Sequence, residues 1–174
     1  VSYGERVAST KERRDQMIQI APGVHMLDDV GSAPAFLLVT GDELALIDTG
    51  MIGQESKVIT QMEERGYAVS DVRTIVLTHS HCDHTGGAAE LAKLSGAKIL
   101  AHQDETPYIK QEKTQPAPSP LLRVLFWVFD RIYQTHISSI DATLKNGDTL
   151  DILGGLEVIH VPGHTPGSIA LYQA

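Results

Sequence analysis

The chain has 174 residues, of which 42% are hydrophobic and 21% are charged, and its formal net charge is -8. This length and composition are typical of one globular domain, and the negative charge argues against a nucleic-acid partner. No run of 18 apolar residues occurs, so we expect no membrane partner and a cytoplasmic location.

The first part of the chain predicts a leader followed by a meander of antiparallel strands. Residues 1–15 are rich in charged side chains, and we interpret them as a flexible leader before a domain over 16–174. Short apolar runs separated by turn residues then predict four strands, at 17–20, 24–27, 35–40 and 44–48. The last two strands are expected to form a hairpin.

The middle of the chain predicts a βαβ unit and therefore an α/β fold. An amphipathic pattern indicates a helix over 54–65. An apolar strand at 74–78 then leads into a helix over 88–94 and a second strand over 97–101. Ligands of α/β sheets bind beyond the carboxyl ends of such strands, so we expect a site between the first strand and the helix that follows it.

Three histidines and an aspartate follow the first strand of this unit within six residues, as His79, His81, Asp83 and His84. Imidazole and carboxylate groups are ligands that borderline divalent ions prefer. Without a metal, these groups would compete for protons and leave polar atoms unpaired. The spacing therefore predicts a metal site. We interpret Cys82, the only cysteine, as a neighbour of the ligands.

Residues 111–138 interrupt the alternation and are interpreted as a helical insertion or lid. A proline-rich piece leads into a helix over 121–133 that is apolar around most of its circumference. We expect protein, a partner subunit or substrate to cover it. Three interpretations stay open: an ordinary buried helix, a lid that brings Phe126, Trp127 and Phe129 near an apolar substrate group, or an interfacial membrane contact.

The end of the sequence returns to short strands, with a histidine between the last two. The predicted strands lie at 142–144, 149–153, 156–161 and 169–172. His164 stands between two Pro-Gly pairs, whose restricted backbone can hold it in place. Alone it is more often a loop residue, but with His79 and His81 it supplies the third imidazole of a His-rich site.

Three motifs occur in order along the chain: Leu46–Gly50 (LIDTG), Thr78–Gly87 (THSHCDHTGG) and Val161–Ser168 (VPGHTPGS). With them the chain resembles the metallo-β-lactamase fold superfamily over residues 16–174, and the second motif is most similar to that of glyoxalase II-like hydrolases. The resemblance implies an α/β fold, an αββα sandwich with metals at one edge of its two sheets. It also implies that the closing part of the second half is missing from this sequence, with a bridging Asp and a last His ligand.

The resemblance also assigns roles to particular residues. The metal ligands that it implies are His79, His81 and His164 for a first ion and Asp83 and His84 for a second. Asp83 is thereby expected at the catalytic centre, and Asp48 is expected beside it, where it orients a ligand. An Asp after a strand is otherwise most often a turn residue. Two divalent ions are expected, with zinc as first choice and iron or manganese as alternatives.

The implied function is a metal-dependent hydrolase whose activated water attacks a thioester, a lactone or a related carbonyl compound, with a small molecule as substrate. A β-lactamase is a further option within this class. One alternative is a mononuclear iron oxidoreductase of the persulfide dioxygenase type. The other is an inactive fragment or assembly module that forms a homodimer through the helix at 121–133.

Overall fold

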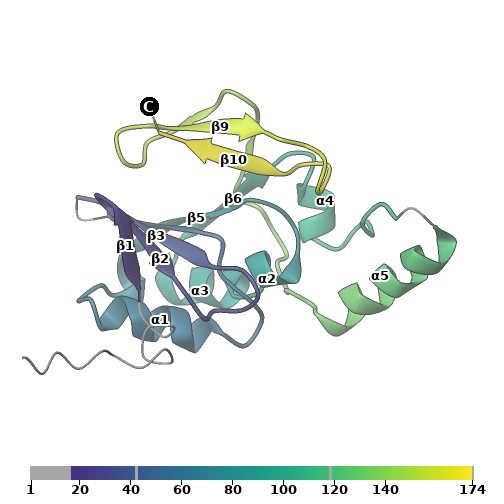
Figure 1. The fold of residues 1–174 in the computed structure, drawn as a ribbon, viewed down its shortest axis with the longest axis horizontal. Coiled ribbons are helices and arrows are strands. Elements are labelled where there is room, and N and C mark those ends of the chain that lie inside the picture. The colour runs from purple at the N-terminus through teal and green to yellow at the C-terminus, as the bar shows by residue number, and fades with distance from the viewer. Residues whose placement is uncertain (1–16, 42, 118, 174) are drawn as a thin grey trace, which may run out of the picture.

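Two β-sheets build the body of the chain and face each other (Figure 1). A computed structural model describes residues 17–41, 43–117 and 119–173, so the predicted leader at 1–15 lies outside the described residues. Within these ranges the larger sheet has the strand order β1 (Ile18–Ala21), β2 (Val24–Leu27), β3 (Ala35–Thr40), β4 (Glu43–Ile47), β5 (Val72–Leu77), β6 (Lys98–His102) and β7 (Ala142–Leu144). The smaller sheet has the order β10 (Ile169–Tyr172), β9 (Leu156–His160) and β8 (Thr149–Leu150).

The directions of the strands agree with the predicted meander and βαβ unit. Strands β1 to β4 pair antiparallel, whereas β4, β5, β6 and β7 run parallel. Helix α3 (Ala88–Ser95) connects β5 to β6, and the short helix α2 (Cys82–Thr85), which the sequence pattern does not predict, precedes it. Parallel pairing brings the carboxyl ends of β4, β5 and β6 to one edge of the larger sheet.

Two helices cover the face of the larger sheet that points away from β9 and β10 (Figure 1). These are α1 (Glu55–Glu63) and α3, and the 3₁₀ helix η1 (Val69–Asp71) lies between α1 and β5. Val58, Met62 and Leu91 are fully buried in the core between these helices and the sheet. For α1 this packing uses the apolar face that the amphipathic pattern over 54–65 predicts.

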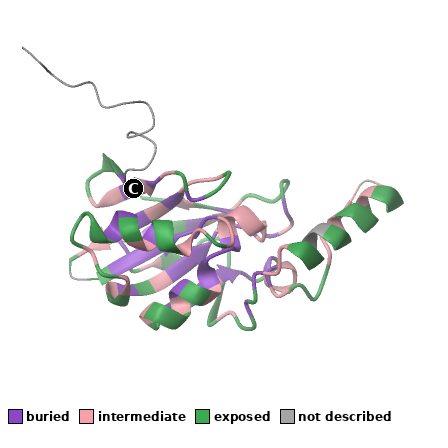
Figure 2. Cartoon of the chain, turned by 90° about the horizontal axis from the view of Figure 1, so that it is seen from below, coloured by how far each residue is buried: buried purple, intermediate pink, exposed green. Residues whose placement is uncertain are grey.

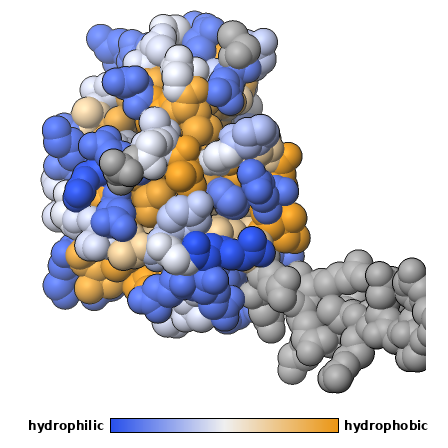
Figure 3. Space-filling view, turned by 90° about the vertical axis from the view of Figure 1, so that its left-hand side faces the viewer, coloured by the Kyte–Doolittle hydropathy of each residue, from blue (hydrophilic) through white to orange (hydrophobic). Residues whose placement is uncertain are grey.

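A second core fills the space between the two sheets. Its buried side chains are Leu38, Ala45, Ile47, Val76, Leu144, Ile152, Leu156, Val158 and Ile169. Strands β4 and β5 contribute to both cores, which accounts for the apolar runs Leu44–Ile47 and Ile75–Leu77 within them. Among the described residues, helices, larger sheet and smaller sheet form successive layers, which confirms the predicted α/β sandwich. Figure 3 views the molecule from the left-hand side of Figure 1 and shows hydrophobic side chains across the middle of that face.

The predicted strand at 149–153 is too long. Strand β8 ends at Leu150, and the N–H of Ile152 then donates to the carbonyl of Leu150 at 2.9 Å. Leu153 has a left-handed backbone with φ 53°, and its N–H donates to Thr40 Oγ1 at 3.0 Å. The chain turns early because this turn buries Ile152 in the core between the sheets.

Helix α5 (Pro120–Ile132) projects from the body beside the short helix α4 (Thr106–Ile109) (Figures 1 and 2). Its interpretation as an ordinary buried helix is wrong, since Leu121 is 79% and Ile132 69% exposed. Phe126 is half-buried and Trp127 is exposed, while the side chain of Phe129 lies outside the described part of the chain. The homodimer through this helix stays a prediction. No helix within the described ranges is long and apolar enough to cross a membrane.

Candidate metal centre

The candidate site lies at the edge of the larger sheet where β4 and β5 end. Asp48 directly follows β4, and His79 comes two residues after β5. The loop between β9 and β10 carries His164, and the N–H of Ile169 at its end donates to the carbonyl of Thr78 at 3.1 Å. Three segments that are far apart in the sequence therefore meet beyond the carboxyl ends of parallel strands, where the βαβ pattern predicts a ligand site.

The close approach of the first two segments depends on glycine. The N–H of Thr49 donates to the carbonyl of His84 at 2.7 Å, and the N–H of Gly86 donates to the carbonyl of Gly50 at 3.0 Å. A Cβ atom on Gly86 would lie 2.1 Å from the backbone nitrogen of Ile52. No larger residue fits there unless the loop moves, so Gly86 fixes the loop after β4 against α2.

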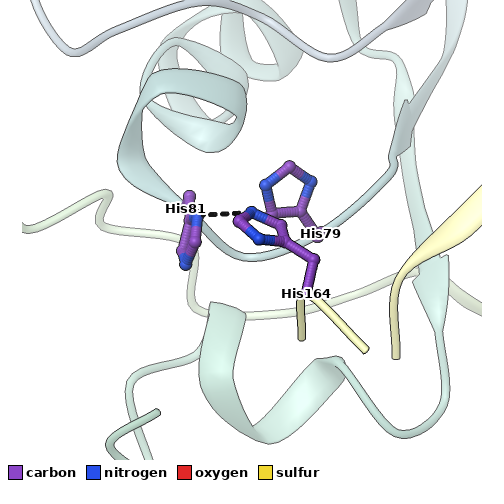
Figure 4. A group of neighbouring side chains, drawn as sticks. All are labelled: His79, His81 and His164. Atoms are coloured by element: carbon purple, nitrogen blue, oxygen red, sulfur yellow. Dashed lines mark hydrogen bonds between the residues drawn. The ribbon is translucent and has the colours of Figure 1, made fainter. Parts of the chain in front are cut away.

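His79, His81 and His164 form a compact group of three imidazoles (Figure 4). The ring of His79 lies 4.8 Å from each of the other two, between centroids, and the rings of His81 and His164 are 4.6 Å apart. One ring nitrogen from each residue lies within 4.8 Å of the others. Nε2 of His164 is 3.1 Å from Nδ1 of His81. Three imidazole nitrogens at this spacing are a donor set that suits a zinc ion.

The protonation of His79 follows from its hydrogen bonds. The hydroxyl of Thr78 donates its one proton to Asp48 Oδ2 at 2.7 Å. Nδ1 of His79, 3.0 Å from the same hydroxyl oxygen, therefore donates, and Nε2 carries a lone pair. Nε2 is buried and has no hydrogen-bond partner among the described residues. An unsatisfied buried acceptor costs roughly 1–3 kcal/mol, and a metal ion bound to it removes that cost.

Burial also keeps His79 and His81 uncharged. Burial, together with the rings of His84, His81 and His164, lowers the pKa of His79 to about 3. Burial and the neighbouring His164 lower the pKa of His81 as well. Both side chains are therefore neutral at pH 7 and keep the lone pairs that a metal ion requires.

His84, Asp83 and Asp48 form a second group beside the first. The ring centroid of His84 lies 3.9 Å from that of His79, and its Nδ1 lies 2.7 Å from Asp48 Oδ2. Burial alone would lower the pKa of His84, but the hydrogen bond to Asp48 and the charge of that carboxylate raise it. Nε2 of His84 lies 4.0 Å from Asp83 Oδ1. A histidine that donates to a carboxylate through one nitrogen and offers the other is typical of metal sites.

The carboxylate of Asp83 is held in place by Ser32, whose hydroxyl donates to Asp83 Oδ2 at 2.6 Å. Burial acts to raise the pKa of Asp83, but this hydrogen bond and the nearby His84 outweigh burial and lower the pKa. Asp83 is therefore ionised at neutral pH. The structure brings together all the side chains predicted as ligands, namely His79, His81, Asp83, His84 and His164.

Asp48 makes more contacts than a turn residue needs. The residue is 4% exposed, and its backbone has a left-handed φ of 57°. Oδ1 accepts the N–H of Thr78 at 2.8 Å, and Oδ2 accepts both the Thr78 hydroxyl and His84 Nδ1. Through these bonds Asp48 orients His84 directly and His79 through Thr78. This is the position that a ligand-orienting carboxylate requires.

We expect Asp48→Asn to weaken zinc binding by roughly 10–100-fold, the usual effect of losing an outer partner of a ligand. The amide has the same shape but only one acceptor oxygen, so it cannot accept on both sides as the carboxylate does. Competition titration against a chelator measures the affinity. The control is Asp151→Asn, on an exposed side chain. Equal zinc affinity in the two variants would contradict the orienting role.

Glu105 is a member of the site that the sequence analysis missed. Its side chain is 0% exposed and joins the two loops that carry His81 and His164. Oε1 accepts the N–H of Ser80 at 2.9 Å, and Oε2 accepts the N–H of Gly167 at 2.7 Å. A Cβ atom on Gly167 would lie 2.7 Å from the Glu105 Cβ, so glycine permits this approach. Glu105 follows β6, the parallel neighbour of β5. This position at the same edge of the sheet as His79 is the feature of the sequence that points to it.

A further group of possible donors is formed by His102, Asp104 and His160. The two imidazoles stack with their centroids 4.1 Å apart and their planes at 16°. Nitrogen lone pairs lie in the ring planes, so those of stacked rings do not converge on one ion. Nε2 of His160 donates to the carbonyl of Pro166 at 2.9 Å. We interpret this pair as packing that supports the loop of His164.

Comparison with known proteins identifies the family. The family model described as Metallo-beta-lactamase superfamily matches residues 28–174. The chain belongs to the metallo-beta-lactamase superfamily. It is 28% identical over 172 residues to the probable metallo-hydrolase YflN of Bacillus subtilis. This match covers 94% of this chain and 64% of that protein. It is 34% identical over 101 residues to a hydroxyacylglutathione hydrolase of Pseudomonas paraeruginosa. This match covers 58% of this chain and 28% of that protein.

Solved structures of the superfamily agree with this assignment. The crystal structure of BJP-1, a subclass B3 metallo-beta-lactamase of Bradyrhizobium japonicum, matches with a TM-score of 0.74 at 25% identity. The match covers 88% of this chain and 55% of that structure. The chain thus spans between 28% and 64% of the length of these three relatives. The resemblance to the superfamily and the predicted fold class are confirmed.

In this superfamily member a cavity of about 440 Å³ adjoins the metal centre. Its lining includes the candidate ligands His81 and Asp83 as well as Leu125 and Phe126 of α5. The interpretation of α5 as a pocket wall is therefore supported for Phe126, whereas Trp127 is not part of the lining.

Proposed function

We propose that this protein is a metal-dependent hydrolase that cleaves a thioester, a lactone or a related ester of a small molecule. The group of three imidazoles around the buried Nε2 of His79, which has no hydrogen-bond partner among the described residues, carries this proposal. We assign a first divalent ion to His79, His81 and His164 and a second to Asp83 and His84, with zinc as the metal. The names of the metallo-hydrolase and hydroxyacylglutathione hydrolase relatives support this class of reaction.

The chemistry divides between the metal and the chain. Divalent ions, when bound, supply the Lewis acidity that activates water and polarises a carbonyl oxygen. Asp48 and Thr78 fix the rings of His84 and His79, and the ionised Asp83 orients water at the site. In the overall reaction the water oxygen adds to the carbonyl carbon and the C–S or C–O bond breaks. A proton from the water passes to the leaving thiolate or alkoxide.

We expect chelation to remove the activity and zinc to restore it. The protein is assayed with acyl thioesters, lactones, simple esters and β-lactams before and after treatment with dipicolinate, and bound metals are counted by elemental analysis. We expect loss of hydrolysis in parallel with loss of zinc, because the neutral imidazoles alone supply neither the Lewis acid nor the activated water.

Other results of the same assays would contradict the proposal or favour one of the two alternative functions. Hydrolysis that survives complete metal removal would contradict the proposal. One iron per chain with oxygen uptake on a persulfide favours the oxidoreductase. A dimer that binds no metal and cleaves none of these substrates favours the assembly module.

A further inference from the structure

We infer that the cavity between the metal centre and helix α5 binds an apolar chain of the substrate, and that Leu125 and Phe126 set the chain length that it accepts. The inference rests on the proposed function, because that function places the scissile carbonyl beside His81 and Asp83. The cavity volume of about 440 Å³ is in the range of pockets that enclose small-molecule ligands.

The lining of the cavity combines polar and apolar side chains, and Gln111, Lys113 and Gln115 from the segment before α5 are among the polar ones. Polar groups near the metal centre are those of Ser32, Ser80, His81 and Asp83. The apolar members are Met51, Ile109, Leu125 and Phe126. A carbonyl group suits the polar part and a hydrocarbon chain suits the apolar part, since burial of apolar surface drives binding to such a wall.

The segment before α5 is attached to the metal site, and the end of α5 is attached to that same segment. Before α5, the side-chain amide of Gln115 donates to the hydroxyl of Ser80, which lies between the candidate ligands His79 and His81. After α5, the side-chain amide of Gln111 donates to the carbonyl of Tyr133 at 3.3 Å. The first bond ties the segment before α5 to the loop of the ligands, and the cavity lining places Leu125 and Phe126 opposite that loop, where they can limit the length of a bound chain.

Two leucines one turn apart on α5 distinguish a pocket wall from a merely apolar helix. Leu125 lines the cavity and is 56% exposed, so a bound chain can cover it. Leu121 does not belong to the lining, and water covers most of it. Each leucine is therefore replaced separately by the same larger residue. The substitution of Leu125 changes the pocket, and the substitution of Leu121 changes only the surface.

The experiment measures kcat/KM on the zinc-loaded protein with two substrate series. In one series the acyl group lengthens from acetyl to decanoyl while the thiol stays the same; in the other the thiol lengthens while the acyl group stays acetyl. In one of the two we expect kcat/KM to rise roughly tenfold or more with chain length, as added methylenes enter an apolar pocket. Leu125→Trp is expected to lower the ratio of long-chain to short-chain kcat/KM about tenfold, whereas Leu121→Trp leaves the ratio unchanged.

Calorimetric titration with a non-hydrolysable long-chain thioether separates this inference from the proposed function. We expect binding with a negative heat-capacity change, which marks apolar burial, and weaker binding in Leu125→Trp only. That result without any hydrolysis supports the pocket and contradicts the proposed function. Hydrolysis without a chain-length preference in either series, or an equal effect of Leu121→Trp, overturns the pocket and leaves the proposed function standing.

Discussion

Replacement of His81 by alanine is expected to abolish high-affinity zinc binding while the sandwich stays folded. The substitution removes one of three imidazoles whose nitrogens converge at the sheet edge, including the one 3.1 Å from His164 Nε2. We expect zinc affinity to fall by more than roughly 100-fold, which is the upper range for loss of a residue that only hydrogen-bonds to a ligand, because His81 is itself a ligand. His81 lies outside both apolar cores, so we expect the circular dichroism spectrum and the unfolding temperature of the metal-free protein to change little.

Equilibrium dialysis followed by elemental analysis gives the zinc content of this variant. The control is His136→Asn, at an exposed histidine whose φ of 54° asparagine tolerates. We expect wild-type zinc content in the control. An unchanged zinc content in His81→Ala would remove the basis for the site.

Replacement of Glu105 by alanine is expected to reduce both stability and zinc affinity. The buried carboxylate accepts the N–H groups of Ser80 and Gly167, and both lose their partner in the variant. Each unsatisfied donor costs about 1–3 kcal/mol in free energy of unfolding. The same change frees the loops of His81 and His164 from each other, so we expect zinc affinity to fall about 10–100-fold.

Zinc affinity separates a positioning role of Glu105 from a purely structural one. It is measured at a temperature where all variants remain folded, beside the control Glu157→Ala at an exposed position on β9. Glu105→Gln keeps one acceptor oxygen and should fall between the wild type and the alanine variant. A loss of stability with unchanged zinc affinity would mean that Glu105 supports the fold but does not position the ligands.

Much of the metal centre could be predicted because it is local in the sequence. The donors from His79 to His84 follow one strand within six residues, and their chemistry alone indicates a metal. Asp48 needed the family motif, and His164 is informative only together with His79 and His81, since a single His or Asp in a loop carries little information. Glu105 was missed because its role depends on two backbone N–H groups from distant loops, which no side-chain pattern records.

The fold was predicted where burial imposes a period on the sequence. Strands β2 to β6 and helix α1 follow from apolar runs and stripes, because these elements bury a defined face. Strand β1 is an exception, since all four of its residues are exposed. The same rule failed for α5, whose stripes resemble those of a core helix although Leu121 and Ile132 are exposed. The alternating pattern over 149–153 also predicts a strand that is too long, because the chain turns after Leu150 and buries Ile152 between the sheets. Periodicity shows which residues are apolar but not what covers them.

Anomalous X-ray diffraction at the zinc edge, from crystals of the zinc-loaded protein, locates the bound zinc ions directly. We predict a strong peak among His79, His81 and His164 and a second beside Asp83 and His84. The stacked pair His102 and His160 provides an internal control, at which we predict no peak. Zinc bound at that pair, or no zinc among the three histidines, would contradict the metal centre proposed for this chain.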